Sequence, residues 1–443
     1  MAPTILAARR ALCLLALAPC ATHAGLSIDE ALARHRDLSN PGTRHEATLS
    51  LFLPDEATPD GLVVAAGGPG ETVPPLLRPT LPGLGGVQWT RRGGSADGLQ
   101  WRIGLGWRDS AAHSFSLDGS ELSAPLGAGR AYASVGRRHW GPSWVGSLIL
   151  DSAAPAIPSN GWRKTESTRF ASPWLSWLGP WNADLFFGAL SGHVQPRHPK
   201  LIGMRAQFMP LPDLELGISR AMEWGGSGRP QTVNALWQAF IGRGDNPVDE
   251  AGQKNEPSNQ LAGFDARYTL RTDAGPTYSI YAQAIGEDKS HSLPVKYLGS
   301  VGIDTAFAWR GVTTRWFAES ANTVAGGFGG GTSPGIAYQH HIYLQGYTEQ
   351  GKSLGYPAGG DVKLVSVGAL FDTGPIAAVL MFHKGTAKAR SQFFAPGGSL
   401  SGANAALAWR IDNTWRVGAQ IDRWHDPRGD QRRAQLWLQY AMR

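Results

Sequence analysis

Hydrophobic and polar residues alternate with a period of two along much of the chain, and the pattern is clear from Leu99 onward. Between Leu99 and Arg108 the odd positions carry Leu, Trp, Ile, Leu and Trp, whereas the even positions carry Gln, Arg, Gly, Gly and Arg. Successive side chains of a β-strand point to opposite faces, so this pattern predicts a strand with one apolar face. A soluble β-sandwich gives the same alternation, so one strand does not identify the fold.

The same alternation returns in later segments, which lie at 202–208, 262–270, 415–422 and 436–442. Large apolar residues occupy one face of each segment, and Arg, Asp, Gln or Gly mostly occupy the other. This recurrence favours an all-β fold, a transmembrane antiparallel β-barrel with a lipid-facing exterior and a wet lumen. The run from Leu214 to Trp224 departs from it because Arg220 shares the apolar face. We interpret Arg220 as a bulge position or as an arginine at the level of the lipid headgroups.

Two helices are predicted beside the strands. Ser27 and Glu30 have the spacing of a helix capping box, and apolar residues follow at helical intervals, so a short helix is expected within residues 25–42. A second helix is predicted near Thr165 to Leu178, where Gly179 and Pro180 would end it. The first extended run is expected from His45 to Leu53, before a loop rich in Pro and Gly.

Composition supports export and the barrel. The chain has 443 residues with 57 Gly, 17 Trp and only 17% charged residues, which suits a barrel with aromatic girdles. Residues 1–24 have the form of a secretory signal with Arg9 and Arg10 at its start, and residues 25–443 then form one outer-membrane barrel. A lipoprotein box ending at Cys20 is the alternative. Removal of both arginines leaves 39 Lys and Arg against 35 Asp and Glu, a formal charge of +4 that does not favour nucleic acid. Both cysteines lie in the signal, so no disulfide is expected.

One stretch stands apart from the alternation. Residues Arg137 to Leu150 begin with two arginines and a histidine, pass through Trp-Gly-Pro-Ser-Trp, and end in an apolar run that is predicted to be a strand. This stretch resembles a conserved-looking block of the Wzi family of capsule-assembly proteins. Further segments are similar to blocks of the same family in the same order; they are Leu201–Arg205, Leu214–Arg220, Trp224–Pro230, Asn259–Asp265 and Ile285–Asp288.

The resemblance implies a fold and a function. It implies an outer-membrane barrel of about 18 strands with periplasmic helices. It also implies a lectin that attaches capsular polysaccharide or exopolysaccharide to the cell surface, and not an enzyme. We therefore expect a monomer in the cell outer membrane that contacts lipid and surface polysaccharide, with no cofactor, metal or nucleic acid.

The candidate site residues are aromatic, cationic, acidic and amide side chains in these blocks. Indoles stack on sugar rings and arginine pairs with carboxylates, yet the same side chains can instead form a polar network inside the lumen. The candidates for polysaccharide binding or for the lumen network are Arg137, Arg138, Trp140, Trp144, Arg205, Arg220, Arg229, Asn259, Gln260, Asp265, Arg267, Glu287 and Asp288.

Other classes of protein remain as alternatives. Glu287 and Asp288 could form a glycosidase pair, but adjacent strand residues diverge, so we expect lumen ion pairs with Arg205, Arg220 or Arg267 instead. His340 and His341 would point to opposite faces and could not easily share a metal. A porin-like channel for small solutes is the main alternative function. A polysaccharide-modifying enzyme is a third, and the sequence shows no nucleophile with its base and orienting group.

Overall fold

The computed structural model describes most of the chain after its first 25 residues. The described ranges are 26–39, 51–67, 76–78, 85–108, 115–241, 258–272, 275–290, 293–327 and 331–442, with side chains left out at 288–295. The predicted signal segment lies outside them.

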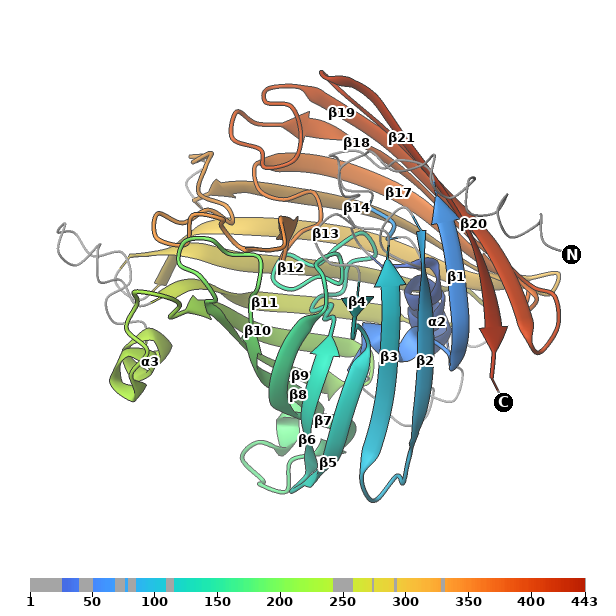
Figure 1. Ribbon diagram of the computed structural model, residues 1–443, viewed down its shortest axis with the longest axis horizontal. Coiled ribbons are helices and arrows are strands. Elements are labelled where there is room, and N and C mark those ends of the chain that lie inside the picture. Colours follow the sequence, from blue (N-terminus) through green and yellow to red (C-terminus); the bar gives the residue numbers. More distant parts are fainter. Residues whose placement is uncertain are drawn as a thin grey trace, which may run out of the picture.

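Nineteen strands form one antiparallel sheet (Figure 1). The first ten are β1 (Gly61–Gly67), β2 (Gly85–Gly94), β3 (Gln100–Arg108), β4 (Phe115–Ser116), β5 (Ser120–Leu126), β6 (Gly129–Gly136), β7 (Ile157–Arg169), β8 (Pro180–Ala189), β9 (Lys200–Leu211) and β10 (Leu214–Trp224). The others are β11 (Ser258–Leu270), β12 (Thr277–Ser290), β13 (Leu293–Trp309), β14 (Val312–Gly326), β17 (Val362–Asp372), β18 (Ile376–Ala387), β19 (Ser399–Arg410), β20 (Trp415–Asp426) and β21 (Gly429–Ala441).

The sheet closes on itself. Strand β1 pairs with β2 on one side and with β21 on the other, while β4 and β5 both pair with β3, so the ring has 18 strands. Apolar side chains of β3 such as Ile103 and Trp107 are exposed on its outside, as a lipid-facing surface requires. The predicted antiparallel β-barrel is therefore confirmed.

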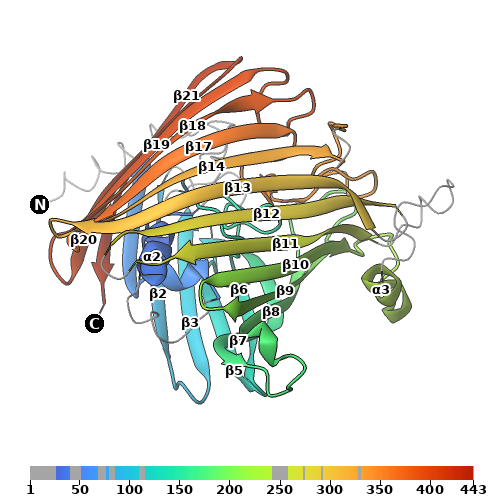
Figure 2. The same ribbon diagram turned by 180° about the vertical axis from the view of Figure 1, so that it is seen from behind.

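The lengths of the connections give the barrel its orientation. Short turns such as the one between β9 and β10 gather at one end, together with the start of β1 and the end of β21. Longer connections lie at the other end (Figure 2), and their described residues are 137–156, 190–199, 225–241, 331–361 and 388–398. Outer-membrane barrels have short periplasmic turns and long extracellular loops, so the first end is periplasmic.

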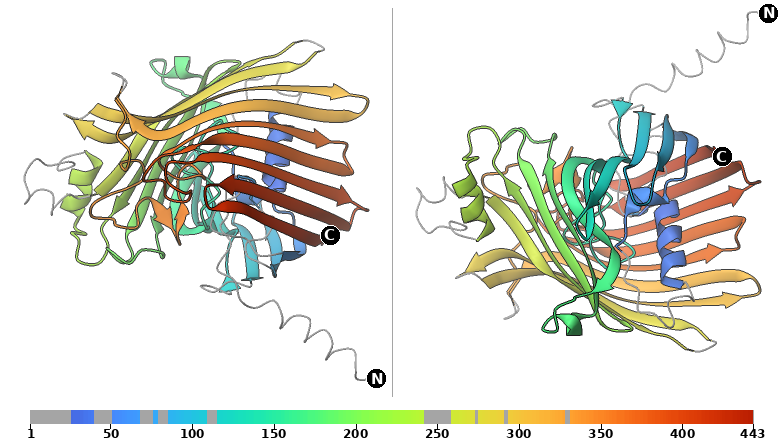
Figure 3. Two further views of the ribbon diagram at one scale, coloured as in Figure 1. Left: turned by 90° about the horizontal axis from the view of Figure 1, so that it is seen from above. Right: turned by 90° about the horizontal axis from the view of Figure 1, so that it is seen from below.

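Helix α2 (Ile28–Ser39) confirms the predicted N-terminal helix. The Ser27 amide donates to Glu30 Oε2 at 2.8 Å and the Glu30 amide donates to Ser27 Oγ at 3.3 Å, which is the expected capping box. The helix lies within the ring at its periplasmic end (Figure 3), where Arg36 donates to Asp372 at 2.7 Å and Asp29 pairs with Arg416. Both wall residues lie next to periplasmic turns, so α2 narrows that mouth of the barrel.

Three predictions of local structure were wrong or fall outside the described part. The stretch 165–178 is not a helix, because β7 continues to Arg169 and only the 3-10 turn η3 (Ser176–Leu178) follows. Its aromatic residues lie in the connection between β7 and β8, where Phe170 stacks on Trp181 of β8 with ring centroids 4.7 Å apart. The run 45–53 is described only from 51, where no strand is present before β1. Residues 147–150 are buried without strand structure.

Helix α3 (Val233–Phe240) was not predicted, and it explains Arg220. The helix packs on the outer wall of the barrel against Met222 and Trp224 of β10. Arg220 points outward from the same strand and donates to the carbonyl oxygens of Ala239 and Phe240, at 3.0 and 2.6 Å. The register of β10 shifts near Leu214 and not at Arg220, so the arginine caps a helix end and does not mark a bulge.

The remaining elements are short. They are η2 (Pro54–Ala57) and the two-stranded hairpin of β15 (Thr348–Glu349) and β16 (Lys352–Ser353). No helix in the described ranges is long and apolar enough to cross a membrane.

Candidate functional site

The connection between β6 and β7, residues 137–156, folds back into the barrel, and we call it the plug. It carries the distinctive Trp-Gly-Pro-Ser-Trp stretch, and nearly all of its side chains are buried. Glu319 on β14 accepts hydrogen bonds from the plug amides of Trp144 and Val145, the second at 3.0 Å, and from Tyr281 Oη at 2.7 Å. These backbone amides of the plug have no neighbouring strand to donate to, and side chains of the barrel wall accept their hydrogen bonds instead.

Trp144 lies at the centre of the lumen. Its indole Nε1 donates to Asp304 Oδ2 at 3.0 Å, and the guanidinium carbons of Arg34 and Arg315 lie 5.0 and 5.2 Å from its ring centroid. Asp304 also accepts from Arg267 and Arg315, each at 2.5 Å. A carboxylate shared by two arginines and an indole forms a buried polar network, so Trp144 joins plug, wall and α2.

Trp140 fixes the other end of the same stretch. Its ring packs edge-on against Phe186 of β8 with centroids 5.7 Å apart. A Cβ atom on Gly203 would come within 2.8 Å of the Trp140 ring and 2.1 Å of Phe186, so the wall needs glycine at this position. Gln283 donates to the Trp140 carbonyl oxygen at 2.7 Å. Trp140 is thus a packing residue with no open face for a sugar.

Residues 331–361, between β14 and β17, cover the plug from the extracellular side. Tyr338 Oη donates to the Leu148 carbonyl at 2.7 Å, and Tyr347 Oη donates to the Ile149 carbonyl at 2.9 Å. A Cβ atom on Gly146 would lie 2.1 Å from Pro357, so the two segments are in close contact. In the described part of the chain, α2, the plug and residues 331–361 together fill the lumen.

The two arginines that begin the plug are also paired inside the barrel. Arg137 donates to Asp118 at 2.7 Å, and its amide donates to Asp55 at the same distance. Arg138 lies 3.6 Å above the Phe186 ring and donates to Asp184 at 3.3 Å. Both guanidinium groups are committed to the wall, and their role in polysaccharide binding remains a prediction.

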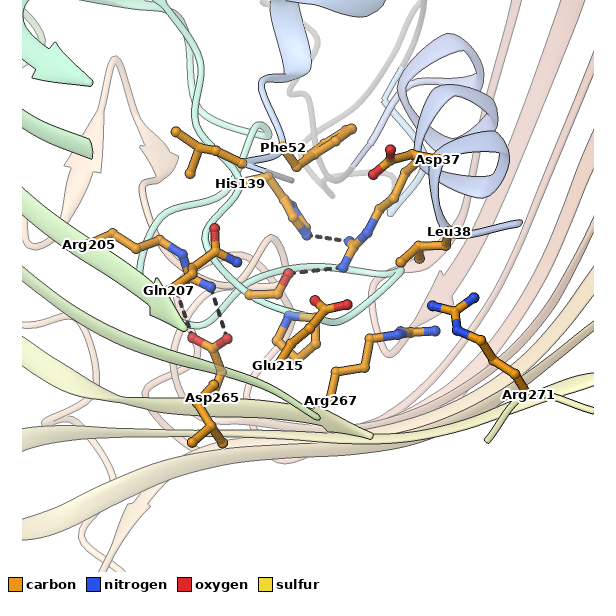
Figure 4. Close-up of a pocket in the computed structure, with 15 residues that line it drawn as sticks. Asp37, Leu38, Phe52, His139, Arg205, Gln207, Glu215, Asp265, Arg267 and Arg271 are labelled. Atoms are coloured by element: carbon orange, nitrogen blue, oxygen red, sulfur yellow. Dashed lines mark hydrogen bonds and ion pairs between the residues drawn. The ribbon is translucent and has the colours of Figure 1, made fainter. Parts of the chain in front are cut away.

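A polar pocket at the periplasmic mouth contains three more candidates, Arg205, Asp265 and Arg267 (Figure 4). The pocket lies between α2, the plug and strands β9 to β11 and is open to solvent. Arg205 makes a two-pronged pair with Asp265 at 2.6 and 2.9 Å, and Arg267 is held by Asp304. Both arginines already pair with carboxylates of the barrel, so their positive charges are balanced before any ligand enters the pocket.

The remaining candidates lie near the extracellular end. Asn259 donates to Glu223 at 2.7 Å, and Gln260 donates to the Ala239 carbonyl at 2.8 Å while it accepts from Arg220. The Arg229 amide donates to Gly226 at 3.0 Å in the turn that follows β10.

The predicted ion pairs of the Glu287 and Asp288 pair with Arg205, Arg220 or Arg267 are wrong for Glu287. Those arginines contact Asp265, α3 and Asp304 instead, and Glu287 accepts a hydrogen bond from the Tyr338 amide at 2.8 Å. The side chain of Asp288 lies outside the described part. Separate strands bring the true partners together, which sequence spacing does not reveal.

A buried histidine and aspartate in the plug have the form of a catalytic dyad but a different role. His139 Nδ1 lies 2.9 Å from Asp151 Oδ2, and Arg34 Nη1 lies 2.9 Å from His139 Nε2. The Ser143 carbonyl oxygen lies 3.0 Å from the same Nε2 and also accepts a hydrogen bond from Arg34 Nη1 at 2.6 Å. Burial lowers the pKa of His139, although Asp151 opposes the shift. In a catalytic dyad the nucleophile would lie next to His139 Nε2, and here Arg34 of α2 takes that place. The pair therefore positions α2.

Docking of α2 is expected to weaken in acid. Burial, and next the Arg315 guanidinium, lower the pKa of His35 from 6.5 to about 4, although Asp372 opposes the shift. An undocked His35 would bind a proton near pH 6.5, so the stability of docking falls as pH drops from about 6.5 to 4, by about 3 kcal/mol. Hydrogen exchange of residues 28–39, corrected for its intrinsic pH dependence, measures this loss. The H35Q variant should show a weaker dependence, and an equal dependence would contradict the assignment to His35.

The extracellular surface carries two cationic groups that sequence reasoning missed. Lys388 and Arg390 are exposed on the connection between β18 and β19, and His341, which the sequence suggested only as a weak metal ligand, is exposed on residues 331–361. Gln339 Nε2 donates to the Arg390 carbonyl at 3.2 Å, and the Lys388 amide donates to the Asp361 carbonyl at 2.8 Å, so the two loops form one surface. We call Gln339, His341, Lys388 and Arg390 the loop surface. Its only signal in the sequence was a position outside the alternating segments.

The closed ring, the apolar exterior and the filled lumen define a plugged β-barrel of the outer membrane. The chain matches the family model of the capsule assembly protein Wzi over residues 96–435 and belongs to that family. A curated Klebsiella pneumoniae protein, described as an uncharacterized 55.8 kDa protein in the cps region, is 37% identical over 184 residues. That match covers 42% of this chain and about a third, 36%, of the relative.

One solved structure agrees closely with the fold. The structure of Wzi from Escherichia coli, described as an outer membrane protein involved in group 1 capsule assembly and a carbohydrate-binding β-barrel, superposes with a TM-score of 0.75. It is 22% identical, and the match covers 95% of each chain. OccK10 from Pseudomonas aeruginosa is more distant, with a TM-score of 0.47 and 8% identity over 87% of this chain and 99% of its own.

Proposed function

We propose that this barrel binds capsular polysaccharide or exopolysaccharide at its extracellular loops and so retains the polymer at the cell surface. Membership of the capsule assembly protein Wzi family supports a role in capsule assembly. The carbohydrate binding described for the Escherichia coli protein supports a carbohydrate as the ligand. The observation that supports binding at the extracellular loops is the loop surface, where Lys388, Arg390 and His341 are exposed above the plug.

The mechanism follows from the chemistry of these side chains. Lysine and arginine donate charge-assisted hydrogen bonds to carboxylates of an acidic polymer, and amides bind sugar hydroxyls. Each contact is weak, but a polymer repeats the same unit many times, so several barrels can hold one chain by avidity. Retention then needs an exposed surface and no deep pocket.

The buried candidates support this surface from below. Trp140, Trp144, Arg137 and Arg138 hold the plug, and the plug holds residues 331–361 through Leu148 and Ile149. We infer that these residues position the loops and do not bind the polymer themselves. We also infer that the barrel acts as a lectin and not as an enzyme. We infer a monomer as well, because the pairing of β1 with β21 closes the main sheet of the described residues and leaves it no edge to which a second chain could add a strand.

The loop surface can be tested by removing its two cations. The K388A/R390A variant is expected to release polysaccharide into the medium, raising the released fraction several-fold while total polymer stays constant, because two charge-assisted contacts per barrel are lost. Polysaccharide in washed cells and in medium is measured in a strain that carries only the variant.

The matched control removes two exposed arginines at the periplasmic end. R310A/R410A makes the same change in charge on turns that cannot meet the capsule, and it should behave as the parent. Equal release by both variants, or retention unchanged by K388A/R390A, would count against the loop surface.

A further inference from the structure

Helix α3 exposes large apolar side chains. Its sequence, from Val233 to Phe240, contains no charged residue, and its polar residues are Asn234 and Gln238, one turn apart. Leu236 and Ala239 pack on the outer wall, whereas Val233 and Trp237 are 85% and 56% exposed. Exposed apolar side chains gathered on one short helix are unfavourable in water and are typical of a helix that is covered by something apolar.

The position of α3 on the barrel indicates what covers it. Met222 and Trp224, under the helix, lie at the extracellular end of β10, and Arg220 beneath them caps the helix carbonyls. The helix end therefore reaches down the lipid-facing wall, beside exposed residues such as Ile218 and Phe264. Figure 3 shows α3 at the end of the barrel that carries the long connections. Because exposed apolar residues of the barrel wall face lipid, we place the exposed apolar side chains of α3 at the level of the outer leaflet.

Two basic residues lie at the extracellular edge of this apolar area. Lys200 pairs in register with Trp224, and it shares the outward face of β9 with Ile202, which packs on the helix cluster. Arg197 is exposed in the turn before β9, and its carbonyl accepts from the Ser227 amide at 2.8 Å, which holds the turn against the start of the α3 connection. Among the described carboxylates, none forms an ion pair with either residue.

We propose that α3, Arg197 and Lys200 form a binding site for a phosphorylated glycolipid of the outer leaflet. The acyl chains lie against Val233, Trp237 and Phe240, and the headgroup phosphates accept hydrogen bonds from Arg197 and Lys200. Cations placed just outside an apolar area with a tryptophan match the amphipathic structure of such a lipid. A surface polysaccharide has no acyl chain and does not fit the apolar part. The site is thus separate from the loop surface and gives the barrel a second partner.

The test uses the full-length barrel in detergent and native mass spectrometry with added lipid A. The R197A/K200A variant is expected to lower the affinity for lipid A about tenfold, because both basic contacts with phosphate are removed. The V233S/W237S variant should weaken binding of both lipid A and its dephosphorylated form, since these exposed side chains do not pack on the wall.

A matched control lies on the same rim. Lys363 and Lys384 point outward at the extracellular ends of β17 and β18, where no described helix covers the wall, so K363A/K384A should change lipid A binding little. An equal loss in that control would show general attraction of anionic lipid and overturn the site. Equal binding of dephosphorylated lipid A by the parent would overturn the phosphate contacts. Full competition by millimolar inorganic phosphate would show a site for a free anion and overturn the lipid assignment.

Discussion

Removing residues 139–154 is expected to turn a non-conducting barrel into an ion-conducting one. The plug is the segment that contacts both α2 and residues 331–361, so its loss removes support for the other two blocks of the lumen. Gly136 and Ile157, which flank it, pair in register, so a short turn can join β6 to β7 without disturbing the wall.

Single-channel recording in a planar bilayer measures this change. The parent protein should give no steady conductance, whereas the deletion variant should give steady open events. The K388A/R390A variant, which alters only the surface, serves as the matched control and should remain silent. Steady conductance of the parent would favour the porin-like alternative. A silent deletion variant would mean that α2 and residues 331–361 block the lumen without the plug.

The D304N variant is expected to destabilise the folded barrel by about 3 to 5 kcal/mol. Asparagine keeps the size of the side chain but removes the negative charge that Arg267 and Arg315 share, which leaves two buried cations close together. Breaking a buried pair by removing one partner has a cost of this size. The indole of Trp144 also loses a charged acceptor, so the plug loosens with the wall.

Urea unfolding in lipid vesicles, followed by the gel mobility of the folded form, gives the free energy of unfolding. Asp430 provides a matched control because it also pairs with an arginine, Arg423 at 2.6 Å, but at an exposed turn. Surface pairs contribute little, so D430N should leave the midpoint nearly unchanged. A midpoint of D304N equal to that of D430N would contradict the central role of Asp304.

The strands and the N-terminal helix were predictable because their signals are local. The alternation at 99–108 indicates a strand with one face in lipid, and the spacing of Ser27 and Glu30 indicates the start of a helix. The failed helix at 165–178 has the same cause. Its apolar residues, such as Phe170 and Trp174, stand at helical spacing but lie in the connection that follows β7, and periodicity alone does not separate a helix from such a connection.

The plug was noticed but misinterpreted. Apolar residues such as Ile149 and Leu150 look the same in a lipid-facing strand and in a buried irregular segment. What distinguishes them is the set of acceptors on the wall, Gln283, Asp304 and Glu319, which lie more than a hundred residues away in sequence. The loop surface was missed for the related reason that exposed loop residues obey no period.

The filled lumen bears on how many copies a cell can tolerate. An open barrel of this width would leak small solutes, so its abundance would be limited by the integrity of the envelope. A barrel whose interior is occupied by its own chain carries no such penalty. If the loops hold polymer as proposed, the cell can raise the number of attachment points, and with it the thickness of its coat, while its permeability stays constant.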